Sequence, residues 1–108
     1  MREIVASFLF KIEMKFLFLD LENVTVTSSP SSNINEDDSL SLTCHVESSG
    51  DITIRWFKDQ QELSETSSVL NMNSIQRSDS GSYWCTVTNG FKNITSEIVD
   101  VPVNCKII

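Results

Sequence analysis

The stretch Asp79-Ser-Gly-Ser-Tyr-Trp-Cys85 decides the fold of this 108-residue chain. From its tyrosine onward, side chains alternate between two faces: Tyr83, Cys85 and Val87 on one, and Trp84, Thr86 and Thr88 on the other. A period of two with one apolar face indicates a half-buried β-strand. Asn89-Gly90 follows and supplies the two positive-φ residues that a tight type I′ hairpin turn requires. The stretch therefore predicts a strand that buries one face and then turns back.

Short alternating segments of the same kind occupy the chain on both sides of this stretch. They cover residues 23–27, 40–46, 52–57, 70–75 and 99–103. Polar, turn-forming residues separate them at the spacing of roughly 8–12 residues that is typical of antiparallel β-sandwiches. No helical period of useful length follows Leu21. The sequence therefore predicts an all-β fold of two packed antiparallel sheets.

Two further residues make the pattern specific. Cys44 lies on the apolar face of the strand expected over 40–46, and Trp56 lies on the apolar face of the next strand. With them the chain resembles the immunoglobulin superfamily. The matching motifs are Leu42-Thr-Cys44, Trp56-Phe-Lys58, Leu70-x-Met72-x-x-Ile75 and Asp79-x-Gly81-x-Tyr83-x-Cys85. The resemblance implies an immunoglobulin-like antiparallel two-sheet sandwich.

The resemblance also implies a disulfide between Cys44 and Cys85 that joins the two sheets, with Trp56 packed on the sulfur atoms. Only about a dozen residues, most of them polar, separate Trp56 from Leu70. A variable-type domain needs room in this region for two further strands. The domain is therefore expected to be of the constant-2 or intermediate type.

Three residues of the deciding stretch receive structural roles from the same resemblance. Tyr83 is expected to form a tyrosine corner, in which its hydroxyl bonds back to the backbone. Gly81 is expected to supply backbone freedom to the turn that enters the strand. Together with Asp79, these residues are expected to belong to the core of the fold and to take no part in binding.

Residues 1–20 differ in composition from the rest of the chain. They hold four of the six phenylalanines, and their charges sum to zero, so that residues 21–108 carry the whole net charge of -7. Charged residues interrupt every apolar run in this segment, which leaves two interpretations open: a poor signal peptide or a misjoined leader. We expect residues 1–20 to be dispensable, 21–103 to form the domain, and 104–108 to be a tail or a junction to a further domain.

Charge and hydropathy argue against two classes of partner. With 15 acidic and 8 basic residues, the chain repels phosphate backbones, so a nucleic-acid partner is not expected. The longest apolar run, Phe16 to Leu19, is far shorter than the ~20 residues that cross a bilayer, so no membrane insertion by this fragment is expected.

The sequence offers little catalytic or metal-binding chemistry. The single histidine, His45, belongs to no nucleophile motif, so the chain is expected not to be an enzyme. A zinc site needs about four Cys or His ligands, and Glu36-Asp37-Asp38 lacks the spacing of a calcium loop. We therefore expect no metal and no cofactor, and a solvated acidic loop at 36–38.

The compartment follows from the cysteines and from two glycosylation motifs. A structural disulfide needs an oxidising compartment. Asn23-Val-Thr25 and Asn93-Ile-Thr95 are acceptor motifs for N-linked glycans, so Asn23 and Asn93 are candidate modification sites. Both features favour an extracellular location, at the cell surface as part of a membrane receptor or secreted. Cys105 is left without a partner in this pattern, and it either forms an intermolecular disulfide, bonds to a following domain, or has no partner.

A finer resemblance points to the extracellular domains of Fc receptors and Fc-receptor-like proteins. Besides the deciding stretch, it rests on Arg55-Trp-Phe-Lys58, Thr88-Asn-Gly90 and Val101-Pro-Val103. It implies a leukocyte cell-surface receptor that acts in immune recognition and signalling, with an immunoglobulin or another surface protein as ligand. Two alternatives stay open: a homophilic adhesion module, and a structural intracellular immunoglobulin domain with reduced cysteines.

Strand alternation also predicts where a partner would bind. Because Trp56, Tyr83 and Cys85 point inward, their neighbours Arg55, Phe57 and Trp84 must point outward. Phe91 follows at the tip of the expected hairpin. Aromatic residues and arginine are the side chains that most often anchor protein interfaces. Arg55, Phe57, Trp84 and Phe91 are therefore the candidate partner-binding residues.

Overall fold

The computed structural model describes residues 21–105, so the expected leader at 1–20 and the last three residues lie outside the described part. The described residues form strands and one short 3₁₀ helix. In chain order these are β1 (Leu21–Ser29), β2 (Leu40–Ser48), β3 (Thr53–Lys58), β4 (Gln61–Glu62), β5 (Val69–Met72), η1 (Arg77–Asp79), β6 (Gly81–Thr88), β7 (Asn93–Thr95) and β8 (Val99–Val101).

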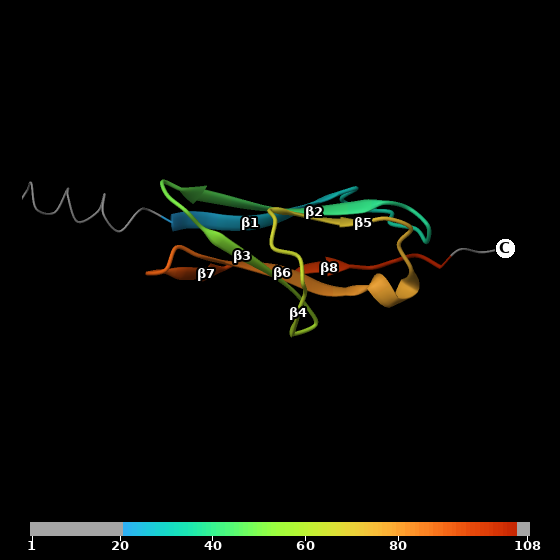
Figure 1. Ribbon diagram of the computed structural model, residues 1–108. Helices are drawn as coiled ribbons and strands as arrows, with labels where there is room; N and C mark the ends of the chain where they lie inside the picture. The colour runs from blue at the N-terminus through green and yellow to red at the C-terminus, as the bar shows by residue number, and fades with distance from the viewer. Residues whose placement is uncertain (1–20, 106–108) are drawn as a thin grey trace, which may run out of the picture.

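The strands form two antiparallel sheets that pack face to face (Figure 1). The first sheet has the order β1-β2-β5. The second has the order β4-β3-β6-β7, with β8 pairing to β6 beyond the end of β7. The described chain enters at one end of the sandwich and leaves at the other (Figure 1). The expected all-β two-sheet sandwich is confirmed.

A disulfide and a tryptophan hold the two sheets together. Cys44 in β2 is bonded to Cys85 in β6, with 6.4 Å between the Cα atoms and 41 residues between them in sequence. Trp56 in β3 pairs directly with Cys85 and is fully buried. Its indole N–H donates to the carbonyl of Ser67 at 2.8 Å, which satisfies its one polar atom. The implied arrangement of disulfide and tryptophan is therefore present.

Apolar side chains from both sheets fill the space around this centre. The buried set comprises Leu21, Val24, Ile34, Leu40, Leu42, Ile54, Leu70, Ile75, Tyr83, Val87 and Val101, in addition to the disulfide and Trp56. Most of them lie at the positions that strand alternation assigns to the inner faces. The outer faces are thereby fixed too, which is what positions the candidate site.

Asp79 and Gly81 lie at the turn into β6 and only partly inside, so the expectation that they belong to the core is wrong. The Asp79 carboxylate accepts the backbone N–H of Gln76 at 2.7 Å and so caps η1. Gly81 has no positive φ. A Cβ atom there would lie 2.6 Å from an oxygen of Asp59, whose carboxylate accepts the N–H of Ser82. Gly81 therefore provides space for Asp59, and not backbone freedom.

The turn after β6 also differs from the expected type I′ hairpin. Four residues, 89–92, connect β6 to β7, and only Gly90 among them has a positive φ, of 92°. The Asn89 side-chain oxygen accepts the backbone N–H groups of Phe91 and Lys92 at 2.9 and 2.8 Å. This side chain stabilises the longer loop, because asparagine readily bonds to the backbone just after it.

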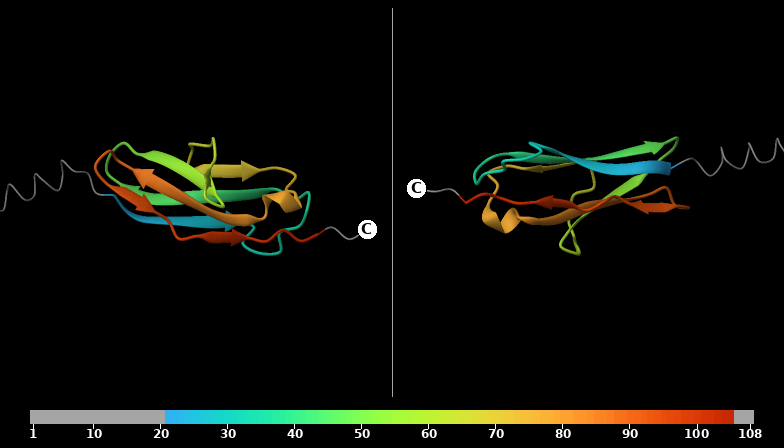
Figure 2. Two further views of the ribbon diagram at one scale, coloured as in Figure 1. Left: turned by 90° about the horizontal axis from the view of Figure 1, so that it is seen from below. Right: turned by 180° about the vertical axis from the view of Figure 1, so that it is seen from behind.

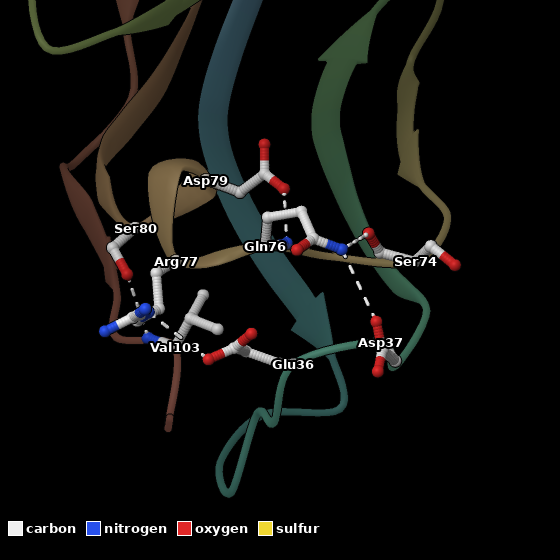
Figure 3. A network of polar contacts seen from close by, with 8 residues as sticks. All are labelled: Glu36, Asp37, Ser74, Gln76, Arg77, Asp79, Ser80 and Val103. Atoms are coloured by element: carbon white, nitrogen blue, oxygen red, sulfur yellow. Dashed lines mark hydrogen bonds and ion pairs between the residues drawn. The ribbon is translucent and has the colours of Figure 1, made fainter. Parts of the chain in front are cut away.

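Glu36 and Asp37 connect their loop to the segment around η1 (Figure 3). Glu36 forms an ion pair with Arg77 at 3.4 Å, and the amide of Gln76 donates to Asp37 at 3.4 Å. On the other side of η1, the Ser80 hydroxyl accepts the N–H of Val103 at 3.1 Å. These contacts give the acidic residues a structural role, where the sequence suggested a merely solvated loop.

The expected end of the domain at Val103 is followed by one more attached residue. Asn104 donates its N–H to the carbonyl of Ile34 and accepts the N–H of Glu36 at its own carbonyl, at 2.7 and 3.1 Å. Cys105 is exposed and has a free thiol. The described chain is thus paired to the sandwich up to the residue before this cysteine.

Tyr83 forms the tyrosine corner: its hydroxyl donates to the carbonyl of Asp79 at 2.5 Å. Burial, and then the nearby carboxylates of Asp79 and Asp59, raise the pKa of Tyr83 to about 12. Tyr83 is the only tyrosine of the chain, so phenolate absorbance reports on it alone.

We expect the phenolate absorbance of the folded chain to appear with a midpoint near pH 12, against about 10 for an unfolded tyrosine. The pKa of Tyr83 is higher in the folded chain than in the unfolded chain. The stability that Tyr83 contributes is therefore fully present below about pH 10, and it is lost as the pH rises toward 12. Urea unfolding at increasing pH measures that loss. A midpoint near 10 in the folded chain would show that the corner is not formed.

Candidate functional site

The outer face of the five-stranded sheet carries a pair of aromatic rings. Phe57 in β3 lies directly opposite Trp84 in β6. Their ring centroids are 5.7 Å apart and their planes differ by 9°, so the rings are stacked. Both side chains are half-buried, because each covers part of the other and neither points into the core. In the left view of Figure 2 this sheet lies toward the viewer, with β6 between β3 and the β7–β8 segment.

Arg55 continues this face beside the aromatic pair. It lies opposite Thr86, two residue pairs along the same two strands, and it is exposed. Its guanidinium is 3.9 Å from the carboxylate of Glu62 in β4, which itself pairs with Phe57. Because both side chains of this ion pair are more than half exposed, water and salt screen it and it contributes little to stability. The structure therefore brings Arg55, Phe57 and Trp84 together, as the alternation predicts.

A β-bulge places Ile98 next to this face, and sequence reasoning missed it. Thr86 pairs with Thr95 and Tyr83 pairs with Val99, so two residues of β6 face three residues of the opposite segment. The backbone N–H of Ser96 donates to the carbonyl of Cys85, and the N–H of Cys85 donates to the Ser96 hydroxyl. Because Ser96 is thereby paired with Cys85, the additional residue of the bulge lies opposite Trp84. As a result Ile98 is 62% exposed although it lies between two strands.

An open pocket of about 320 Å³ lies where this bulge, β6 and the β3–β4 turn meet. Its lining residues are Asp59, Gln60, Ser82, Trp84 and Ile98. Asp59 and Gln60 both adopt positive φ angles, of 48° and 71°, which form the tight turn between β3 and β4. The Ser82 hydroxyl donates to the carboxylate of Asp100 in β8 at 2.7 Å.

Phe91 lies apart from the other candidate residues. It is 72% exposed in the loop between β6 and β7. Trp84 precedes the last residue of β6 by four positions, or about 13 Å along a strand. Phe91 and the aromatic pair therefore do not form one surface, and a ligand seated on Trp84 contacts Phe91 only if it extends along the sheet to its end.

The two candidate glycosylation residues are both exposed. Asn23 has a φ of 53° at an irregularity in β1, and its amide donates to Glu47 at 3.0 Å. Asn93 begins β7 opposite Thr88, and the motif's Thr95 hydroxyl is 3.0 Å from that of Thr86. The start of β1 and β7 lie at the same end of the sandwich (Figure 1).

Other chemistry is sparse in the part of the chain that the structure describes. The ring of His45 is 2.9 Å from the hydroxyl of Thr27 on the outer face of the other sheet. Within residues 21–105 no group of three or more His, Cys, Asp or Glu side chains is arranged to hold a metal ion. No helix among the described residues has the length and apolarity needed to cross a membrane.

Known proteins show the same pattern. A family model described as an immunoglobulin domain matches residues 23–89. Human Fc receptor-like protein 2 is 28% identical over 94 residues, which cover 79% of this chain and 18% of that protein. Mouse tyrosine-protein kinase receptor TYRO3 is 31% identical over 78 residues, which cover 61% of this chain and 9% of the receptor. The chain thus spans less than a fifth of the length of these receptors.

Solved structures confirm the fold. The second Ig-C2 domain of human Fc-receptor like A superposes with a TM-score of 0.66 at 19% identity, covering 76% of this chain and 96% of that one. Murine CEACAM1b gives a TM-score of 0.66 at 24% identity, covering 78% and 45%. The part of the chain that the family model matches, residues 23–89, is an immunoglobulin domain and not a catalytic one. The chain belongs to the immunoglobulin-domain family and is homologous to domains of cell-surface receptors.

Proposed function

We propose that the chain is an extracellular recognition domain of a leukocyte receptor of the Fc receptor-like kind, acting in immune recognition by binding a protein ligand. The observation that carries the proposal is the Phe57–Trp84 stack on the outer face of the five-stranded sheet. Aromatic residues with a neighbouring arginine are typical anchors of protein interfaces. The similarity to Fc receptor-like protein 2 over most of the chain supports the receptor assignment.

The mechanism is rigid presentation. The stacked rings lie on β3 and β6, which also carry Trp56 and Cys85 of the buried centre. A face fixed in this way loses little conformational entropy when a ligand binds, so more of the contact energy appears as affinity. The domain needs no conformational change to expose its anchor residues.

Two alternative functions are less well supported. A homophilic adhesion module must bring together two copies that each carry a net charge of -7, and these repel one another. A structural intracellular domain would keep its cysteines reduced, whereas this domain has a disulfide between Cys44 and Cys85. Disulfides form and persist in oxidising compartments. A protein ligand outside the cell therefore remains the better proposal.

Immunoglobulin is the first ligand to test. The full chain is immobilised and purified immunoglobulins of each class are passed over it, while analytical ultracentrifugation measures self-association. Saturable binding of at least one class supports the proposal. If no class binds, immunoglobulin is not the ligand. A monomer–dimer equilibrium of the chain at micromolar concentration would favour the homophilic adhesion module instead.

The extracellular assignment predicts N-linked glycans at Asn23 and Asn93, since both residues are exposed and neither is needed by the core. The chain is secreted from mammalian cells behind a heterologous signal peptide and then treated with peptide N-glycosidase F. We expect Asn23→Gln and Asn93→Gln each to remove one glycan from the intact mass. Secretion of a chain without any glycan would contradict this prediction.

A further inference from the structure

The pocket beside Trp84 has the size of a side-chain site. Its volume of about 320 Å³ lies at the small end of the ~300–1,000 Å³ range for ligand pockets. Trp84 and Ile98 supply its apolar wall, and the exposure of Ile98 results from the bulge opposite Trp84. Bulges frequently adjust the direction of side chains beside functional sites. These features fit one large apolar side chain of a partner.

The charged groups around the pocket are acidic. Asp59 lines it, and Asp100 is held at its border by the Ser82 hydroxyl. No lysine or arginine is among the lining residues. The two cations of β3 have other contacts: Arg55 pairs with Glu62, while Lys58 donates to the carbonyl of Ser78 and lies 5.9 Å from the ring centre of Tyr83. Negative charge beside the apolar wall formed by Trp84 and Ile98 attracts basic groups.

We propose that the pocket takes an apolar side chain that is flanked by lysine or arginine in a protein partner. This inference rests on the proposed function, because it places the partner's anchor on the same face as the Phe57–Trp84 stack. Charge complementarity selects a basic partner over a second copy of this chain, since the net charge of -7 makes two copies repel.

The two tryptophans provide a built-in measurement. The indole of Trp84 is half-exposed at the pocket, whereas that of Trp56 is buried and bonded to Ser67. In a ¹⁵N-labelled full chain, the indole N–H resonance of Trp84 therefore reports on the pocket. The resonance of Trp56 serves as the reference for a general change in the fold.

The probes are two capped tripeptides, one with leucine between two lysines and one with leucine between two glutamates. We expect the lysine peptide to shift the Trp84 resonance saturably at millimolar concentration and to leave Trp56 unchanged. The glutamate peptide is expected to bind at least about 3-fold more weakly, and this difference should shrink as salt screens the acidic rim.

Matched variants test the two parts of the pocket. Ile98→Ser should abolish the shift, while Phe91→Ser, which removes a large exposed apolar side chain from the loop between β6 and β7, should leave it unchanged. Asp100→Asn keeps an acceptor for Ser82 but removes the charge, and should weaken the lysine peptide about 3-fold. Asp51→Asn removes an exposed charge in another turn and should have no effect.

Equal binding of the two peptides, or an unchanged shift in Ile98→Ser, would overturn the inference. So would sedimentation of the chain as a dimer, which would assign the face to a second copy. If an immunoglobulin still binds through Trp84 after the peptides fail, only this inference falls. If no immunoglobulin binds while the lysine peptide does, immunoglobulin is excluded as the ligand and this inference stands.

Discussion

Replacing Cys85 by alanine is expected to lower the free energy of unfolding by about 2–5 kcal/mol. The bond from Cys44 to Cys85 closes a loop of 41 residues, which restricts the unfolded chain by about 4 kcal/mol in the chain-entropy model. The sulfur atoms also lie in the buried centre of the sandwich, so the variant loses packing there. Because a typical domain has only ~5–15 kcal/mol of net stability, the effect is a large share of the total.

Urea unfolding under non-reducing conditions measures this loss, and Cys105→Ala is the matched control. Cys105 is exposed and outside the core, so its replacement should change the free energy of unfolding by less than about 0.5 kcal/mol. Non-reducing peptide mapping should find Cys44 joined to Cys85 and to no other cysteine. A peptide that joins Cys105 to either of them would refute the assignment.

The second large effect is expected in binding. Trp84→Ala removes the larger ring of the stack and one wall of the pocket. Anchor residues of interfaces cost about 2 kcal/mol or more when truncated, which is about a 30-fold loss of affinity. The stability of the domain should fall by only about 1 kcal/mol, since the ring is half-exposed and its main packing partner is Phe57.

The inner face of the sandwich could be predicted well because it follows from a period of two. Once Cys44, Trp56 and Cys85 are placed inward, alternation fixes which neighbours point outward. The pairing of Phe57 with Trp84 and the exposure of Arg55 agree with that expectation. A residue's face in a regular strand depends only on its position in the sequence, so no tertiary information is needed.

The rest of the site depends on structural features that leave no periodic pattern in the sequence. β4 has two residues and β7 has three, too few to show alternation. The bulge that exposes Ile98 is a one-residue shift between two strands, visible only once their pairing is known. Ser96 gives no signal in the sequence, yet its hydroxyl accepts the N–H of Cys85 at 3.0 Å inside the sandwich.

The wrong predictions for the turn at 89–90 and for Gly81 have the same origin. Asn89-Gly90 has the composition of a tight turn, but the Asn89 side chain bonds to two backbone N–H groups further on and supports a longer loop. At Gly81, glycine suggests a conformational role because it often has one, whereas in the folded chain the neighbouring Asp59 needs the space. Both outcomes depend on contacts that composition alone does not specify.

Central to the proposed function is the binding of the protein ligand by the outer face of the five-stranded sheet. It is tested most directly by the affinity of Trp84→Ala for an immunoglobulin that binds the full chain, compared with His45→Ala on the outer face of the other sheet. We predict about 30-fold weaker binding for Trp84→Ala, with unchanged binding for His45→Ala and cooperative unfolding in both. Unchanged affinity in Trp84→Ala, with a strongly destabilised domain, would contradict the claim and place the binding site on the loops.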